Sequence, residues 1–262
     1  MDVPAHNRIA WDAQVERGNR WTIPVSADVV DAARQGQWEI VLTPTKPVPR
    51  HWFGPLASSK VLCLASGGGQ QAPVLAAAGA IVTVLDNSPR QLERDAQVAR
   101  AHGLAITTLL GDMAHLEGLR DDHFDLVVHP VSNCFVPEVQ PVWAEAFRVL
   151  RPGGALLAGF NNPFLYIFDQ DLLEDAKRLE VRHPLPYSDA ATLTPGEAAA
   201  RLTAGSPLEF SHTLEDLIGG QMRAGFLLTD MYEDSNRAED SDPINRFTST
   251  YIATRAMKPT GG

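Results

Sequence analysis

The stretch that decides the fold reads Lys60-Val61-Leu62-Cys63-Leu64-Ala65-Ser66-Gly67-Gly68-Gly69-Gln70-Gln71-Ala72-Pro73. A short apolar run ends in three glycines, and an alanine-rich segment of helical character follows as far as Gly79. This order predicts a buried strand, a tight turn and a helix. Glycine has no Cβ atom, so its backbone accepts unusual dihedral angles and lets a nucleoside lie against the main chain. The stretch therefore predicts a nucleotide pocket at the end of a strand.

A second apolar segment, residues 80–85, follows at once and ends at Asp86. In parallel α/β nucleotide sites, a carboxylate at the tip of the second strand binds the ribose hydroxyls. Next, Ser88 stands before Pro89, with Gln91 three residues after the serine. This is the spacing of a capping box, and it predicts a helix that runs to about residue 102.

Further strands alternate with helices along the rest of the chain. Strands are expected at 106–110, 124–129, 155–160, 226–232 and 247–254, with helices at 7–17, 27–35, 139–150 and 213–224. Strands separated by helices indicate an α/β fold whose sheet is covered on both faces. The prediction is a doubly wound, mostly parallel seven-stranded sheet with its ligand at the carboxyl ends of the strands.

The chain divides into four segments on this basis. Residues 1–55 are expected to form an N-terminal extension or lid, and residues 56–160 the nucleotide-binding core. Residues 161–212 are expected to form a substrate cap inserted after the fifth strand, and residues 213–262 the last helix and two strands of the core. The insertion is expected to hold one helix at 171–179 and loops around Pro184, Pro186, Pro195 and Pro207.

Four of the five tryptophans lie in the N-terminal extension: Trp11, Trp21, Trp38 and Trp52. They are open to two interpretations. They can anchor the extension to the main domain, or one or two of them can form a wall of the ligand pocket.

Composition limits the partners and the location. The 262 residues are 44 % hydrophobic and carry a net charge of −10, which opposes attraction to nucleic acid or to an anionic membrane. No apolar run approaches the ~20 residues of a membrane helix, and the first residues do not have the pattern of a secretory signal. The two cysteines, Cys63 and Cys134, have no metal-site or disulfide spacing. We therefore expect a cytoplasmic protein without a metal, as a monomer or homodimer.

The glycine stretch by itself also satisfies G-x-G-x-x-A, a pattern of NAD-binding proteins. Other motifs separate the two interpretations: Asp86-Asn87-Ser88, Gly111-Asp112-Met113, Phe124-Asp125-Leu126-Val127-Val128 and Val149-Leu150-Arg151-Pro152-Gly153-Gly154. With the glycine stretch, this set resembles the class I S-adenosylmethionine-dependent methyltransferases, over about residues 56–160 and again from about 212 onward. The resemblance implies a Rossmann-like methyltransferase fold with S-adenosylmethionine as the cofactor and S-adenosylhomocysteine as its product.

The resemblance also implies roles for single residues. The methionine part of the cofactor is expected to lie against Ala65, Ser66, Gly67, Gly68 and Gly69, and its ribose to bind Asp86. The adenosine is expected beside Asn87 and Gln91. The adenine amino group is expected to contact Asp112, and the adenine ring Met113. The chain departs from the family pattern at two positions. The family usually has an acidic residue, which helps to order the loop, where Cys63 stands, and a glycine where Ala65 stands.

The implied reaction is an in-line displacement at an activated methyl group, driven mainly by proximity and by exclusion of water. A general base is needed only if the acceptor must lose a proton. His129, at the tip of the fourth strand, is the candidate base or cofactor contact, with a backbone hydrogen bond as the alternative role. Polar or aromatic residues expected at the substrate side are Trp21, Asn133, Asn161, Tyr166, His183 and His212.

The sequence therefore predicts a methyltransferase that acts on a small molecule. Two alternatives remain open at this point. One is an NAD(P)-dependent oxidoreductase, and the other is a non-catalytic S-adenosylmethionine-binding module.

Overall fold

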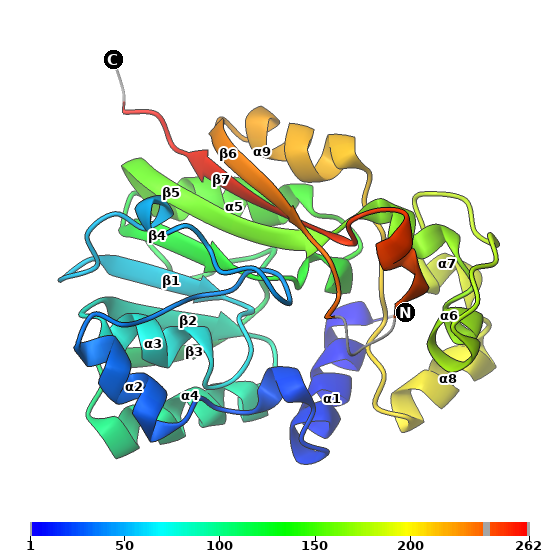
Figure 1. The fold of residues 1–262 in the computed structure, drawn as a ribbon, viewed down its shortest axis with the longest axis horizontal. Coiled ribbons are helices and arrows are strands. Elements are labelled where there is room, and N and C mark those ends of the chain that lie inside the picture. Colours follow the sequence, from blue (N-terminus) through cyan, green and yellow to red (C-terminus); the bar gives the residue numbers. More distant parts are fainter. Residues whose placement is uncertain (1, 238–241, 261–262) are drawn as a thin grey trace.

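The computed structural model describes residues 2–237 and 242–260. Within these residues, seven strands form one sheet in the order β3-β2-β1-β4-β5-β7-β6 (Figure 1). The strands are β1 (Lys60–Leu64), β2 (Ile81–Asp86), β3 (Ile106–Leu110), β4 (Phe124–His129), β5 (Leu150–Asn161), β6 (Leu227–Asp234) and β7 (Tyr251–Met257). Strands β1 to β5 pair in parallel, whereas β7 runs antiparallel to both β5 and β6. The predicted seven-stranded, mostly parallel sheet is confirmed.

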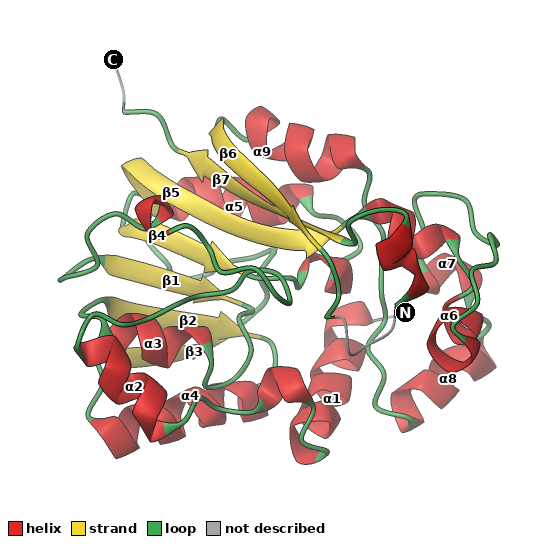
Figure 2. Ribbon diagram, in the orientation of Figure 1, coloured by secondary structure: helices red, strands yellow, loops and turns green. Residues whose placement is uncertain are grey.

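Helices cover both faces of the sheet (Figure 2). Their bounds are α1 (Val3–Glu16), α2 (Ala27–Arg34), α3 (Gln71–Ala77), α4 (Pro89–His102), α5 (Gln140–Val149), α6 (Gln170–Ala176), α7 (Asp189–Thr192), α8 (Pro195–Thr203) and α9 (Gly220–Arg223). Short 3-10 turns connect them: η1 (Arg20–Thr22), η2 (Arg50–Trp52), η3 (Asn133–Phe135), η4 (Pro163–Ile167) and η7 (Pro243–Arg246). None of the helices in the described part of the chain is long and apolar enough to cross a membrane.

The side chains of β1 point alternately to the two faces of the sheet, and the core has one layer on each face. Val61 and Cys63 belong to one hydrophobic cluster, which also holds residues of α2 and α3. Leu62 and Leu64 belong to the other cluster, beneath α5. Successive side chains of a strand point to opposite faces, so a continuous apolar run is the pattern of a strand buried on both sides.

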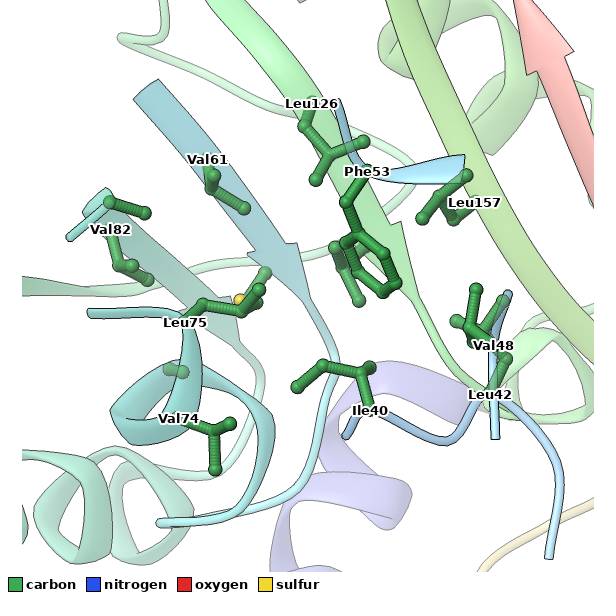
Figure 3. Close-up of a cluster of buried hydrophobic side chains, with 14 of the residues drawn as sticks. Ile40, Leu42, Val48, Phe53, Val61, Val74, Leu75, Val82, Leu126 and Leu157 are labelled. Atoms are coloured by element: carbon green, nitrogen blue, oxygen red, sulfur yellow. The ribbon is translucent and has the colours of Figure 1, made fainter. Parts of the chain in front are cut away.

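The segment that follows α2 is part of the first layer. Ile40, Leu42 and Val48 lie against the strands in Figure 3, together with Phe53. At Gly159 of β5, an added Cβ atom would lie 2.3 Å from the carbonyl oxygen of Leu42. Glycine at this position allows the segment to cross directly over the carboxyl half of the strand. Residues 38–56 are therefore a fixed part of the domain.

The local signals before α4 are confirmed. The Ser88 side chain accepts a hydrogen bond from the backbone N–H of Gln91, with Pro89 in the first turn, and the helix ends at Gly103 in the left-handed region. These residues satisfy the exposed backbone groups of the two helix ends. The side chain of Gln91 does not complete a capping box, because it faces the glycine loop.

Two other predictions were wrong in part, and one predicted helix is present but of a different type. Helix α8 lies in a region predicted to be loop, although Thr194 and Glu197 form a complete capping box at its start. The helix predicted at 213–224 is present, but its first part is the π-helical turn η5 (Glu215–Gly219), which α9 continues. The last strand begins at Tyr251 rather than at residue 247, and the turn η7 precedes it.

Candidate functional site

A cavity of about 940 Å³ lies at the carboxyl ends of β1, β2, β4 and β5. This volume is at the upper end of the ~300–1,000 Å³ that small-molecule sites occupy. Helix α1 and the α8 region also contribute to its wall, and Figure 1 shows α1 between the sheet and the helices of the insertion. The cavity is therefore large for a site that holds one small ligand.

Most of the predicted site residues meet in this cavity. Those that line it are Ala65, Ser66, Gly67, Asp86, Asn87, Gln91, Asp112, Met113, Trp21 and Asn161. The described cavity wall does not include Gly68, Gly69, His129, Asn133, Tyr166, His183 or His212.

Asp86 is the acceptor at the end of β2. Its Oδ1 atom accepts a hydrogen bond of 2.8 Å from the backbone N–H of Ser88. Burial raises the pKa of the carboxyl to about 6, and the nearby charge of Asp12 acts in the same direction. A partly desolvated carboxylate with lone pairs still available is suited to bind two vicinal hydroxyl groups.

Asp112 follows β3 on the neighbouring part of the wall. Its Oδ1 atom accepts from the backbone N–H of Ala114 at 2.9 Å, and its side chain remains one-third exposed. Met113 and Leu85 supply apolar surface beside it. Together with Asp86, this set fits an adenosine: acceptors for the ribose hydroxyls and for an exocyclic amino group, and apolar atoms for the ring.

The glycine loop is held from within the protein. The Gly68 N–H donates to Oε1 of Gln91 at 2.7 Å, and the Gly69 N–H donates to Oδ1 of Asp95 at 2.9 Å. A Cβ atom added at Gly67 would lie 2.7 Å from the carbonyl oxygen of Trp21, and one at Gly69 would lie 2.8 Å from Pro24. One reason for glycine at these two positions is that another segment of the protein itself lies close to the loop. Room for a nucleoside is not the whole explanation.

The segment between α1 and α2 is fastened to this loop. The Val25 N–H donates to the carbonyl oxygen of Gly69 at 2.8 Å. The side-chain amide of Gln70 donates to the carbonyl oxygens of Arg20 and Ile23, at 2.9 and 3.2 Å. The segment therefore lies across the glycine loop and places Trp21 in the cavity wall.

Asn87, predicted beside the adenosine, is also bonded to α1. Its amide donates to the carbonyl oxygen of Pro4 at 2.9 Å and accepts from Nε of Arg8 at 3.1 Å. Next to it, Oγ of Ser88 donates to Oδ1 of Asp12 at 2.5 Å. The loop after β2 thus connects the cofactor end of the cavity to the helix that covers it.

His129 stands at the predicted tip of β4, but it is not part of the described cavity wall; it has the alternative role, a hydrogen bond to the backbone. The side chain is fully buried; Nδ1 lies 2.9 Å from the carbonyl oxygen of Leu64, and Nε2 lies 2.6 Å from Oδ1 of Asn133. Burial lowers the pKa of the imidazole. Because both ring nitrogens are engaged behind the cavity wall, this position suits a residue that ties β4 to β1, not a base.

Four other predicted residues are also absent from the described cavity wall: Asn133, Tyr166, His183 and His212. His212 Nε2 is 3.0 Å from the carbonyl oxygen of Asn133, and both side chains are buried. The Tyr166 ring is 3 % exposed and stacks on Tyr187, whose ring also contacts His183.

The end of the cavity away from Asp86 contains groups that sequence reasoning missed. Glu209 lines the cavity, and its Oε2 atom accepts from the hydroxyl of Tyr166 at 2.7 Å. The same hydroxyl accepts from the amide of Asn161, also at 2.7 Å. Tyr251 and Cys134 line the cavity here as well. No local motif marks Glu209, because a loop of the insertion carries it to the end of β5.

Two of the four tryptophans of the extension anchor it to the main domain, and the other two form part of the cavity wall. Trp52 is 1 % exposed in the core, and Trp38 packs edge-on against Phe53. Trp11 and Trp21 line the cavity, with Trp11 edge-on against Phe135.

In the described part of the chain, no group of three or more histidine, cysteine, aspartate or glutamate side chains is arranged to hold a metal ion. Both cysteines are buried as free thiols.

Comparisons with known proteins identify the family. The family described as "Methyltransferase domain" matches residues 62–158. An uncharacterized methyltransferase of Bacillus subtilis, YbaJ, is 48 % identical over 254 residues, which cover 97 % of this chain and 98 % of that protein.

Solved structures agree in fold. An S-adenosylmethionine-dependent methyltransferase from Mesorhizobium loti has a TM-score of 0.60 at 18 % identity, covering 79 % of this chain and 94 % of that one. The [4+2]-cyclase SpnF has a TM-score of 0.55 at 21 % identity, covering 78 % and 77 %. Since a cyclase shares the architecture, fold alone does not decide the reaction. The full-length relative does decide the family: this chain is a class I S-adenosylmethionine-dependent methyltransferase, not a nicotinamide-dependent oxidoreductase.

Proposed function

We propose that the protein transfers a methyl group to a small molecule that binds beside the cofactor in the same cavity. The observation that carries the proposal is the continuity of one cavity from Asp86 and Asp112 to Asn161 and Glu209. The first two side chains suit an adenosine, and the last two lie at the other end. A ligand with the length of S-adenosylmethionine would therefore present its sulfur between the two ends.

The roof of the cavity favours a small acceptor. Asn7 and Trp11 of α1 line the cavity, as do Arg201 and Ser206 of the insertion. The Asn7 side chain bridges the backbone of Phe135 and Leu208 and so closes the gap between the loop after β4 and the insertion. A polymer would have to displace this helix, and the net charge of −10 opposes a nucleic acid.

The residues at the two ends have different tasks in this reaction. S-adenosylmethionine supplies a methyl group that its sulfonium makes electrophilic. Asp86 and Asp112 hold the adenosine, and the loop Ala65–Gly67 lies beside the methionine part. Trp11 and Trp21 exclude water, which protects the alignment that is worth ~7–11 kcal/mol in well-oriented reactions.

Glu209 is the group best placed to serve an acceptor that has an O–H or N–H. Glu209 lines the cavity, and the hydroxyl of Tyr166 donates to its Oε2 atom. It can accept a hydrogen bond from the acceptor and take up the proton that a hydroxyl loses on methylation. We therefore place acceptors with such a donor group first among substrates, and the reaction in the reducing cytoplasm, where two free cysteines are stable.

The test is a turnover assay with purified full-length protein, S-adenosylmethionine and a panel of alcohols, phenols, amines and thiols. Formation of S-adenosylhomocysteine above the acceptor-free rate, with the methylated product identified by mass spectrometry, is expected. Activity with protein or nucleic acid, and with no small molecule of the panel, would contradict the proposal.

A further inference from the structure

Two side chains of α4 receive two successive amides of the glycine loop. Gln91 accepts from the Gly68 N–H at 2.7 Å, and Asp95 accepts from the Gly69 N–H at 2.9 Å. The two acceptors are four residues apart, so they lie one above the other on the same face of the helix. The loop after β1 is therefore fixed by a helix from which α3 and β2 separate it in the chain.

The burial of Asp95 at this position is unfavourable in free energy. The residue is 1 % exposed, and burial raises the pKa of its carboxyl well above the usual value. Its Oδ2 atom has no hydrogen-bond partner among the described residues. A buried carboxyl group with one oxygen unsatisfied is unfavourable, so packing alone does not account for an aspartate here.

Cys63 lies on the side of the sheet that faces α4. Its side chain is fully buried on β1 and belongs to the same core cluster as Leu92 of α4. Burial raises the pKa of its thiol, and the charge of Asp95 acts in the same direction. Position 63 is the one at which an acidic residue would be expected from the family pattern.

We propose that Asp95 is the positioning residue of the glycine loop, and that it holds the Gly69 amide from α4 in place of an acidic side chain on β1 at position 63. With the Gly68 and Gly69 amides engaged inside the protein, the cofactor meets a preformed loop at Ala65, Ser66 and Gly67, the three loop positions before them that line the cavity. The role belongs to Asp95 because it combines burial with a hydrogen bond to the loop, on a helix that packs in the same core cluster as Cys63.

This proposal rests on the cofactor and not on the nature of the acceptor. Its test therefore uses S-adenosylhomocysteine binding, which needs no acceptor, so that its failure is separate from a failure of the small-molecule assignment. Titration calorimetry on the full chain compares three changes. Asp95→Leu removes the acceptor but keeps the branched shape of the side chain, Asp95→Asn keeps an oxygen that can accept from Gly69, and Glu93→Leu alters the exposed face of the same helix.

Asp95→Leu is expected to weaken S-adenosylhomocysteine binding about tenfold, the effect of one ordered hydrogen bond. Asp95→Asn is expected to stay within about threefold of the wild type, and Glu93→Leu to bind as the wild type does. In the Asp95→Leu background, Cys63→Asp is expected to recover most of the affinity, whereas Cys63→Leu is not. Recovery by an acceptor on β1 separates a role in holding the loop from a general loss of packing.

Equal affinity of Asp95→Leu and wild type would overturn the proposal, as would failure of Cys63→Asp to recover binding in a folded double variant. If Asp95→Leu does not fold, hydrogen exchange of the wild-type protein tests the proposal instead. By hydrogen exchange, the Gly69 amide is expected to be protected in the absence of cofactor to the same degree as the amides of β1. Rapid exchange of that amide before cofactor is added would show that Asp95 does not hold the loop.

Discussion

Asn7 and Leu208 exchange two hydrogen bonds across 201 residues of sequence: the Leu208 N–H donates to Oδ1 of Asn7 at 2.7 Å, and Nδ2 of Asn7 donates to the Leu208 carbonyl oxygen at 3.1 Å. The same amide donates to the carbonyl oxygen of Phe135 at 3.0 Å. One buried side chain thus joins α1, the loop after β4 and the insertion, the three parts that cover the cavity.

Asn7→Ala should loosen this roof. Three backbone groups lose their partner in a buried place, so we expect a loss of about 1–3 kcal/mol in the free energy of unfolding and faster hydrogen exchange in α1. Ile9→Ala, at a side chain of the same helix that is 54 % exposed, is the control and should change neither quantity. An Asn7→Ala protein with wild-type exchange in α1 would show that the helix is held by other contacts.

Binding of the cofactor should reduce the mobility of α1 and of the segment that follows it. Trp11 and Trp21 line the cavity that the cofactor enters, and Gln70 connects the glycine loop to the segment after α1. Hydrogen exchange over residues 3–25 is therefore expected to slow when S-adenosylhomocysteine binds. Equal exchange with and without the ligand would mean a permanently packed extension that does not respond to the cofactor.

Asp86→Asn should stabilise the protein while it weakens the cofactor complex. At pH 7.5 the wild-type carboxyl is ionised in a desolvated place, and removing that charge is expected to increase the free energy of unfolding by about 1–2 kcal/mol. The amide is a poorer acceptor for ribose hydroxyls, so binding of S-adenosylhomocysteine should weaken by about 1–3 kcal/mol. Denaturant unfolding and calorimetry test the two effects. Unchanged affinity would remove Asp86 from the ribose site.

The pH dependence follows from the same group. The pKa of Asp86 is about 6 in the folded protein, above the usual value of 3.8, so the folded state binds its proton more tightly than the unfolded state does. The contribution of Asp86 to stability is therefore most favourable below pH 4 and declines as the pH rises to about 6. Cofactor affinity should change in the opposite direction and fall below about pH 6, when the carboxylate becomes protonated. In Asp86→Asn this change in affinity should be absent.

Ala65→Gly tests the departure from the family pattern. Ala65 has a φ of +46°, in the left-handed region, where a Cβ atom costs about 1–2 kcal/mol relative to glycine. After the greater chain entropy of glycine is subtracted, we expect the substitution to stabilise the protein by about 0.5–1 kcal/mol. Ala96→Gly, within α4, should instead destabilise it by about 1 kcal/mol. A destabilised Ala65→Gly variant would mean that the alanine methyl group has a packing role.

Glu209 and His129 should respond differently to substitution. Glu209→Gln is expected to lower the rate ~10²–10⁴-fold with a hydroxyl acceptor, to remove the acidic limb of the pH–rate profile and to leave cofactor affinity unchanged. His129→Asn is expected to lower the melting temperature but to keep the shape of the pH profile, because the imidazole lies behind the cavity wall. The reverse pattern would restore His129 as the base.

The features that could be predicted from the sequence depend on interactions between residues that are close together in the chain. The bounds of β3 and β4, the cap at Ser88 and the stop at Gly103 depend on neighbouring residues, and the structure agrees with them. The missed helix α8 also had a local signal, the capping box from Thr194 to Glu197. The error there was to interpret Pro195 as a helix breaker when it is at the start of the helix, where proline is favourable.

The rest of the site depends on contacts between distant segments. Nothing next to Glu209 indicates that it reaches the end of β5, and nothing next to Gly69 indicates that Asp95 accepts from it. His129 stands at the predicted strand tip, yet Leu64 and Asn133 engage it from two other elements. Motifs specify which residues gather at the edge of the sheet, but tertiary packing decides which of them face the cavity.

A crystal structure of the full chain with S-adenosylhomocysteine tests the central claim most directly. We predict that both ribose hydroxyls lie within hydrogen-bonding distance of the Asp86 carboxylate and that the adenine lies between Leu85 and Met113. The sulfur should face the open part of the cavity toward Asn161 and Glu209. A ribose bound away from Asp86, or a sulfur that faces a closed wall with no space toward Glu209, would contradict the account.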